Sequence, residues 1–234
     1  MLLPLTLIAG GIAAYFFLMD DSTGTEQNPA GGGSNESGWT ALEQAAAVEY
    51  RGMMSPADRI KKLEWVATQE WARADHGLLR QALITDLDDS VRVRALQLSL
   101  KLATKKNIPH QQRDVIRTGM SSERQAVTME ALDMARQYPA REYIADLKAI
   151  ADSDEEYRFK AIDALAFIDD AEAKAAVLER AMDDDAPKAE RIRAIALLHQ
   201  TKDSNAKSYL EAWAKGGDAE IAEVAREALK GYAN

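Results

Sequence analysis

The sequence predicts an all-α protein, an α-solenoid of about six stacked helix pairs that follows one transmembrane helix and a flexible linker. A recurring phrase predicts the solenoid. It reads VRVRAL (91–96), VTMEAL (127–132), YRFKAI (157–162), ERIRAI (190–195) and VAREAL (224–229). Its alanine returns after 36, 30, 33 and 34 residues, a period typical of stacked repeats. The composition agrees, because 47% of the residues are hydrophobic but only 6% are aromatic, which favours closely packed helices.

The first element is the uncharged run Leu2–Leu18, which we assign to a transmembrane signal anchor over residues 1–19. Its 17 residues cover about 26 Å as a helix, enough for a thin hydrocarbon core. A cleaved signal peptide is the alternative, but no Lys or Arg precedes the run and the residues after it make a poor cleavage site. Small residues suited to packing against other membrane helices lie in this run, namely Gly10, Gly11, Ala13 and Ala14.

Few charges determine the orientation of this anchor. Asp20, Asp21 and Glu26 follow the apolar run, and the first basic residue is Arg51. A hydrophobic start followed by acids favours export of the remaining chain. We therefore expect a single-pass protein of the bacterial inner membrane with its repeat domain in the periplasm. The alternative topology keeps the repeat domain in the cytoplasm.

Residues 20–38 are expected to form a flexible linker. The stretch is rich in Asp, Ser, Gly and Asn, lacks apolar periodicity and contains the run Gly31–Ser34. A flexible chain of this length spans about 20–25 Å from end to end. Such a linker keeps the following domain near the bilayer while leaving it free to swivel.

Residues 39–234 are expected to form the repeat domain. Apolar residues recur there at helical spacing, for example at Val91, Ala95, Leu98 and Leu102. Because one unit cannot bury its apolar face alone, neighbouring units are expected to stack into one continuous core. The recurring alanines would then lie where helices approach most closely, so that a larger side chain there would force the stack apart.

Polar turns separate the two helices of each later unit. Asp and Ser side chains accept hydrogen bonds from the free N–H groups at helix starts, so we expect these turns to cap the helices that follow them. For the first helix, Ser37 or Gly38 is the expected N-cap. The turns lie at residues 86–90, 121–123, 152–156, 183–187 and 216–218.

These residues resemble the HEAT family and its shorter HEAT-like relatives. In that family, two antiparallel helices form each repeat, with an Asp in the turn and Val-Arg then Ala-Leu on the second helix. The resemblance covers Trp39–Asn234, about six units, and implies a fold without implying an activity. Thr128 stands where Arg is expected, and the first unit has only the weak echo Asp58–Ile60, so we expect that unit to be an N-terminal cap. The matching residues are Asp88, Asp89, Val91, Arg92, Ala95 and Leu96, then Asp154, Arg158, Ala161 and Ile162, then Arg191, Ala194 and Ile195.

The sequence predicts neither a cofactor nor a metal site, and no catalytic residues. The absence of cysteine excludes disulfides, thiolate zinc sites and cysteine nucleophiles. His76, His110 and His199 lack metal-ligand spacing, and the acidic turns lack the glycine and distal glutamate of a calcium loop. We therefore expect a protein that is not an enzyme. A HEAT-like lyase, of the kind that attaches bilin pigments, is an alternative that rests on fold analogy alone.

The chain is expected to be a membrane-anchored scaffold that docks a protein partner, such as a membrane complex. Its net charge of −9 disfavours nucleic acid, while residues 2–18 contact the lipid bilayer. An alternative is an accessory structural subunit of a larger membrane complex, held in part by its transmembrane helix. Basic residues on the second helices are the candidate partner contacts, although pairing with carboxylates of the chain itself explains them equally. They are Arg92, Arg94, Arg158, Lys160, Arg191 and Arg193.

Overall fold

The computed structural model describes residues 39–75, 77–106, 109–153 and 155–232. In this part of the chain the secondary structure is entirely helical, which confirms the all-α prediction. The chain divides into two units, Met1–Asn35 and Glu36–Asn234, and the described residues belong to the second. The predicted anchor (1–19) and linker (20–38) lie outside the described residues. Among the helices that are described, none has the length and apolar character needed to cross a bilayer.

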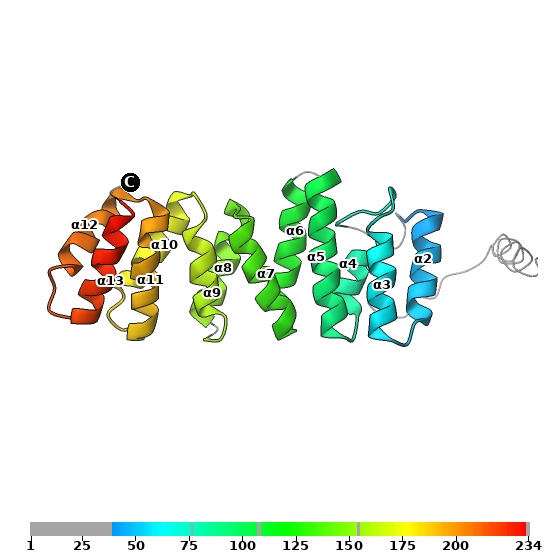
Figure 1. Ribbon diagram of the computed structural model, residues 1–234, viewed down its shortest axis with the longest axis horizontal. Coiled ribbons are helices and arrows are strands. Elements are labelled where there is room, and N and C mark those ends of the chain that lie inside the picture. Colours follow the sequence, from blue (N-terminus) through cyan, green and yellow to red (C-terminus); the bar gives the residue numbers. More distant parts are fainter. Residues whose placement is uncertain (1–38, 76, 107–108, 154, 233–234) are drawn as a thin grey trace, which may run out of the picture. The chain divides into compact units, whose positions relative to one another are not determined.

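The described helices form six pairs, each joined by a short turn (Figure 1). A one-turn 3₁₀ helix, η2 (Arg141–Tyr143), precedes the fourth pair. This arrangement of adjacent helices fits an α-solenoid. The pairs are α2 (Ala41–Gly52) with α3 (Pro56–Val66), α4 (Leu78–Thr85) with α5 (Asp89–Lys106), α6 (Pro109–Met120) with α7 (Gln125–Gln137), α8 (Ile144–Ser153) with α9 (Arg158–Ala166), α10 (Ala171–Met182) with α11 (Lys188–Thr201), and α12 (Ser204–Trp213) with α13 (Ala219–Lys230).

The second helices of the pairs form a continuous layer. The second helices α3, α5, α7, α9, α11 and α13 pack extensively, each on its neighbour in this order, whereas successive first helices contact one another sparsely (Figure 1). We call the exposed side of these six helices the second-helix face. Because the first helices are more loosely packed, cavities open between them.

The recurring alanines form a buried column. Ala95, Ala131, Ala161 and Ala194 are inaccessible to solvent, and Ala228 is 4% exposed. The close approach includes the first helix of a pair. At Gly119 of α6, an added Cβ would lie 2.7 Å from the Cβ of Ala131. The prediction that neighbouring units share one core is confirmed, since the buried hydrophobic residues form one cluster from the first pair to the last.

Helix capping differs in part from the expectation. Asp88 and Asp218 cap α5 and α13 as predicted, because each carboxylate accepts N–H groups of the following turn. The prediction is wrong for α7, α9 and α11, which begin without a side-chain cap. Thr40, rather than Ser37 or Gly38, caps α2 through a reciprocal hydrogen-bond pair with Glu43. Two further caps lie in the loops between pairs, Asp170 for α10 and Asp203 for α12.

Candidate functional site

Three of the six predicted contact residues hold the ends of first helices. Arg158 Nε donates to the carbonyl of Ala151 at 2.8 Å, and Arg191 Nε donates to the carbonyl of Ala181 at 3.5 Å. Arg92 Nε donates to the carbonyl of Asp86. The last carbonyls of a helix have no partner within the helix and carry the negative end of its dipole, so an arginine satisfies and stabilises them.

A related role, missed by sequence reasoning, recurs in the other three pairs, where the second helix bonds to the residues that follow the first helix. Arg59 NH1 donates to the carbonyl of Met54 at 3.0 Å, and Arg226 NH1 donates to that of Ala214 at 3.1 Å. In the third pair, Thr128 Oγ1 donates to the carbonyl of Ser122 at 2.9 Å. The Val-Arg phrase is therefore one form of a more general arrangement. In each pair, a side chain of the second helix donates a hydrogen bond to a backbone carbonyl at the end of the first helix or in the turn that follows it.

The other three predicted contacts form a ladder across the second-helix face. Arg94 NH2 on α5 lies 2.6 Å from a carboxylate oxygen of Glu64 on α3. Lys160 on α9 pairs with Asp133 on α7, and Arg193 Nε on α11 donates to Asp163 of α9 at 2.7 Å. The rung between α5 and α7 is uncharged on one side, because an amide, Gln97, donates to Glu130. We call these four rungs together the polar ladder.

Electrostatically, the second-helix face is mixed rather than uniformly basic. Each cation of the ladder faces an acid from the preceding second helix, and the hydrogen bond that Arg193 donates to Asp163 raises the pKa of Arg193. The side chains of Arg94, Lys160 and Arg193 are still 39, 31 and 47% exposed, whereas those of Arg158 and Arg191 are each 17% exposed. The three ladder cations are therefore more accessible than Arg158 and Arg191.

A buried carboxylate joins the fourth and fifth pairs. Glu190 on α11 is 1% exposed and lies 3.3 Å from Arg158 NH1 of α9. On its other side, Arg180 Nε of α10 is 3.1 Å from the Glu190 carboxylate, and Arg180 also pairs with Asp152 at the end of α8. One acid thereby ties together helices from two repeats, and its two cationic neighbours offset the cost of burying it.

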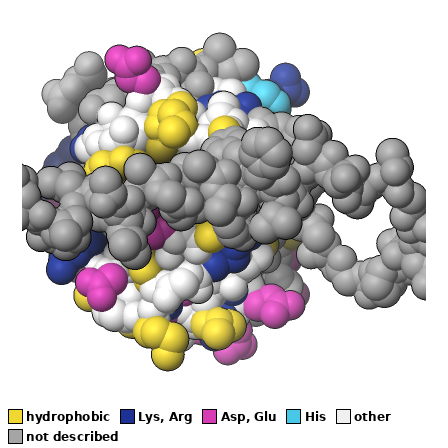
Figure 2. All heavy atoms as spheres, turned by 90° about the vertical axis from the view of Figure 1, so that its right-hand side faces the viewer, with side chains coloured by type: hydrophobic (Ala, Val, Ile, Leu, Met, Phe, Trp, Pro, Cys, Tyr) yellow, Lys and Arg dark blue, Asp and Glu magenta, His cyan; other side chains and the backbone are white. Residues whose placement is uncertain are grey.

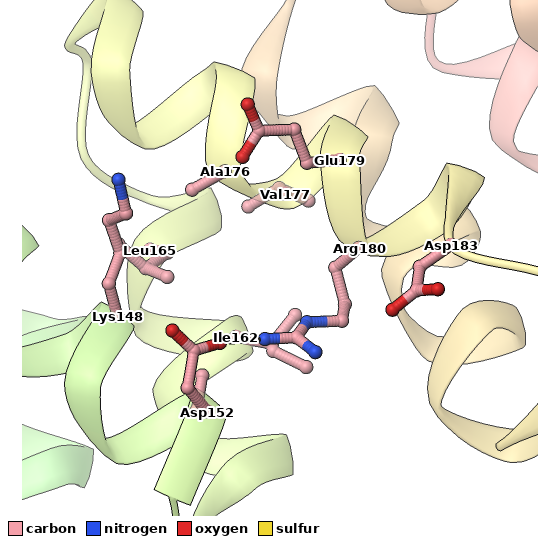
Figure 3. A pocket seen from close by; sticks show the side chains of 10 residues that line it. Lys148, Asp152, Ile162, Leu165, Ala176, Val177, Glu179, Arg180 and Asp183 are labelled. Carbon is pink, nitrogen blue, oxygen red and sulfur yellow. Dashed lines mark hydrogen bonds and ion pairs between the residues drawn. The ribbon is translucent and has the colours of Figure 1, made fainter. Parts of the chain in front are cut away.

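Arg180 also crosses a cavity of about 370 Å³ between α8 and α10 (Figure 3). Figure 3 shows its side chain extending toward Asp152 above a floor that includes Ile162 and Leu165. Among the described residues, Glu179 and Asp183 on the rim make no ion pair. A long cationic side chain would fit such a cavity, because its aliphatic stem can lie on the apolar floor while its charge reaches the rim.

Two buried tyrosines carry the largest pKa shifts in the described part of the chain. Burial raises the pKa of Tyr50 and Tyr143, so both phenols stay protonated. Within the described ranges, no three metal-ligand side chains lie close enough together to hold a metal ion. His110 lies 3.3 Å from Asp114, and His199 Nδ1 lies 2.6 Å from the carbonyl of Ala196.

Comparison with protein-family models and with curated protein sequences finds no match for this chain. The HEAT-like resemblance consequently rests on the repeated residues and the paired helices alone. The predicted membrane-helix contacts, Gly10, Gly11, Ala13 and Ala14, lie outside the described residues.

Proposed function

We propose that the protein is a membrane-anchored, HEAT-like scaffold whose helical repeats dock a protein partner. The polar ladder is the observation that carries this proposal. Its rungs join α3 to α5, α5 to α7, α7 to α9 and α9 to α11. Each rung restricts the motion of long, flexible side chains that would move freely without a partner. A preorganised surface of this kind lowers the entropy lost when a partner binds.

Within this proposal, the six basic residues have two roles. Arg94, Lys160 and Arg193 are the partner contacts, because they are the more exposed members and alternate with acids along the face. Arg92, Arg158 and Arg191 shape the face by holding the ends of first helices. The partner is then a protein with alternating charges rather than a purely acidic one, since each cation already has an acid beside it.

Residues 2–18 hold the scaffold in the bilayer in this proposal, with the repeats in the periplasm of a bacterium. Protease added outside a sealed inner membrane is expected to digest the chain beyond residue 39 while a membrane-bound fragment remains. Protection of the repeats would place them in the cytoplasm. A soluble chain that begins near Asp20 would show that the apolar run is cleaved.

Co-purification tests the docking function directly. The full-length chain is solubilised in mild detergent and its stoichiometric partner is identified, then the experiment is repeated with the double variant Asp163→Arg/Arg193→Asp. This exchange keeps the rung between α9 and α11 but reverses its direction, so the fold is retained while the partner meets the wrong charges. We expect the partner to be lost.

Three other outcomes would redirect the proposal. Retention of the partner by the exchanged variant would remove the second-helix face from the interface. Loss of the partner on deletion of residues 1–19 alone would favour the accessory subunit of a larger membrane complex. Turnover of a substrate by the purified chain would favour the lyase-type enzyme.

A further inference from the structure

Exposed hydrophobic side chains concentrate in the first two helix pairs. Nine large hydrophobic residues are exposed in the described part of the chain, and six of them precede α6. Figure 2 looks onto the end of the repeats at which α2 lies and shows hydrophobic side chains at the surface there. The six are Leu42, Val48, Met54, Trp65, Ile84 and Leu87.

The two most exposed of these residues occupy equivalent turns. Met54, 94% exposed, lies in the turn between α2 and α3, and Leu87, 85% exposed, lies in the turn between α4 and α5. The described residues of the four later turns are mostly polar or small, as at Ser121–Arg124 and Ala214–Asp218. The exceptions differ from the first two turns, because Tyr157 packs partly buried against the core and Met182 at the end of α10 is only 42% exposed. We call Met54 and Leu87 the apolar tips.

A buried polar cluster fixes both turns. Arg59 NH1 donates to the carbonyl of Met54 at 3.0 Å, while its Nε and NH2 donate to the two oxygens of Asp86 at 2.9 and 3.0 Å. Tyr50 also donates its hydroxyl proton to Asp86, the residue before Leu87. The two turns flank a shallow cavity of about 290 Å³ that Arg59 and Asp86 line. The cluster therefore holds both apolar tips out in solvent from one rigid base.

We propose that the apolar tips enter the headgroup region of the bilayer, so that the first two helix pairs rest on a lipid surface. This inference rests on the proposed anchor at residues 2–18. A flexible linker of the predicted length would span about 20–25 Å, and α2 has 12 residues, about 18 Å along its axis. Met54 lies two residues after the end of α2, so a chain held by the proposed anchor would keep its tips within reach of the bilayer.

A lipid surface suits these side chains better than a protein does. Each tip projects singly from its turn, so it is buried by a fluid medium that closes around it, without a complementary pocket. Single apolar contacts bind membranes only weakly on their own. The anchor offsets this weakness, because tethering raises the local concentration of the bilayer around the tips into the millimolar range.

Charge near the apolar tips selects the type of lipid. Asp58 lies in the first turn of the helix after Met54, and Asp88 and Asp89 follow Leu87 directly. Anionic headgroups would repel these carboxylates, and the net charge of −9 adds to that repulsion. The surface that fits is therefore zwitterionic.

The absence of cysteine makes this proposal directly measurable. Single-cysteine variants of the full chain, Met54→Cys and Leu87→Cys, are labelled with a polarity-sensitive fluorophore and reconstituted into phosphatidylcholine vesicles containing brominated acyl chains. Glu123→Cys and Gly217→Cys are the matched controls, because they lie in exposed turns of the third and sixth pairs. We expect bromine quenching to be at least about twofold greater at the apolar tips than at the controls, and to weaken when phosphatidylglycerol is added.

Equal quenching at all four positions, in vesicles that carry the protein on flotation, would overturn the lipid contact and leave the anchor intact. Failure of the protein to float with vesicles would overturn the anchor and the lipid contact together. Shielding of the tip labels without bromine quenching, rising with protein density, would show that a second copy of the chain covers them instead.

Discussion

The first two helix pairs (39–106) and the last four (109–232) share one backbone pattern but differ in what they expose and what ties them together. The first region presents bulky apolar side chains, and its turns are fixed by a cluster around one buried carboxylate, Asp86. The second region presents mainly charged and small side chains, and its helices are tied by pairs on both faces, such as Arg117 with Asp146 and Lys160 with Asp133. The comparison teaches that the repeat specifies the residues buried between helices, whereas the exposed residues can differ from one repeat to the next.

The two ends of the repeats show the same divergence. On the outer side of α13, Glu220, Glu223, Glu227 and Lys230 are exposed, as expected of a terminal repeat that meets only solvent. On α2, Leu42 and Val48 are 60 and 56% exposed. Exposed apolar side chains are costly in water, which agrees with the proposal above that the N-terminal pairs contact a lipid surface.

Removal of Asp86 is expected to have the largest effect on stability. Asp86→Ala would leave the guanidinium of Arg59 and the hydroxyl of Tyr50 without their acceptor in a site where the carboxylate side chain is 4% exposed. We expect the free energy of unfolding to fall by about 3 kcal/mol. This value lies toward the lower limit for a broken buried ion pair, because Arg59 keeps its hydrogen bonds to backbone carbonyls. Urea unfolding measures the loss, and amide hydrogen exchange should show α2 and α3 opening first.

A matched variant separates this cluster from ordinary ion pairing. Asp133→Ala breaks the rung with Lys160, in which the carboxylate side chain is 56% exposed. The expected loss there is about 0–1 kcal/mol. If both variants lost the same stability, the distinction between the buried cluster and the polar ladder would be mistaken.

Removal of Glu190 is the corresponding change in the second region. Glu190→Ala would leave Arg158 and Arg180 without their shared acid, but Arg158 keeps the carbonyl of Ala151 and Arg180 keeps Asp152. We therefore expect a smaller loss than for Asp86, about 2 kcal/mol. Hydrogen exchange should localise the opening to α8–α11, and faster exchange confined to α2 and α3 would contradict this account.

The contact between the two regions is sensitive to volume at Gly119. An added Cβ would lie 2.7 Å from Ala131 of α7 and 3.2 Å from Leu96 of α5, which belongs to the first region. The cost of overpacking should exceed the benefit of the higher helix propensity of Ala. We therefore expect Gly119→Ala to lower the free energy of unfolding by about 1 kcal/mol. Gly52→Ala, which meets nothing within 4 Å, is the control and should be neutral or slightly stabilising in the same urea series.

The fold could be predicted from the sequence because burial repeats. The alanines at 95, 131, 161 and 194 recur once per helix pair, and all four are inaccessible to solvent. The spacing of apolar residues within one helix is enough to predict which face of that helix is buried. The prediction does not depend on which helix packs against that face.

The side-chain partners could not be predicted in the same way. Arg94 and Arg193 reach carboxylates 30 residues earlier in the chain, and Asp86 receives Arg59 from 27 residues before it. Sequence reasoning placed Asp86 among turn residues that cap helices, yet it is buried beneath the turn. Leu87, an apolar residue between aspartates, was the available signal for an exposed tip. The predicted partner contacts and the anchor stay predictions.

The smallest expected effect concerns two helix caps, one in each region. Asp218 accepts N–H groups of Glu220 and Ile221, and Lys188 of α11 lies 2.9 Å from its carboxylate. The hydrogen bond from Lys188, followed by those backbone N–H groups, lowers the pKa of Asp218 from its ordinary value of 3.8. Asp88 caps α5, and hydrogen bonds from the Ser90 side chain and from backbone N–H groups lower its pKa as well.

Because both carboxylates titrate at lower pH in the folded chain than in the unfolded chain, their stabilisation is complete above about pH 5 and is lost as the pH falls below 3.8. Asp218→Asn and Asp88→Asn keep the cap but remove the charge, so each should reduce the loss of stability between about pH 5 and pH 3. Salt distinguishes them, because screening weakens the Lys188 pair and leaves the Ser90 hydrogen bond intact. Urea midpoints at low and high salt measure this, and equal salt sensitivity would show that Lys188 contributes nothing to the cap.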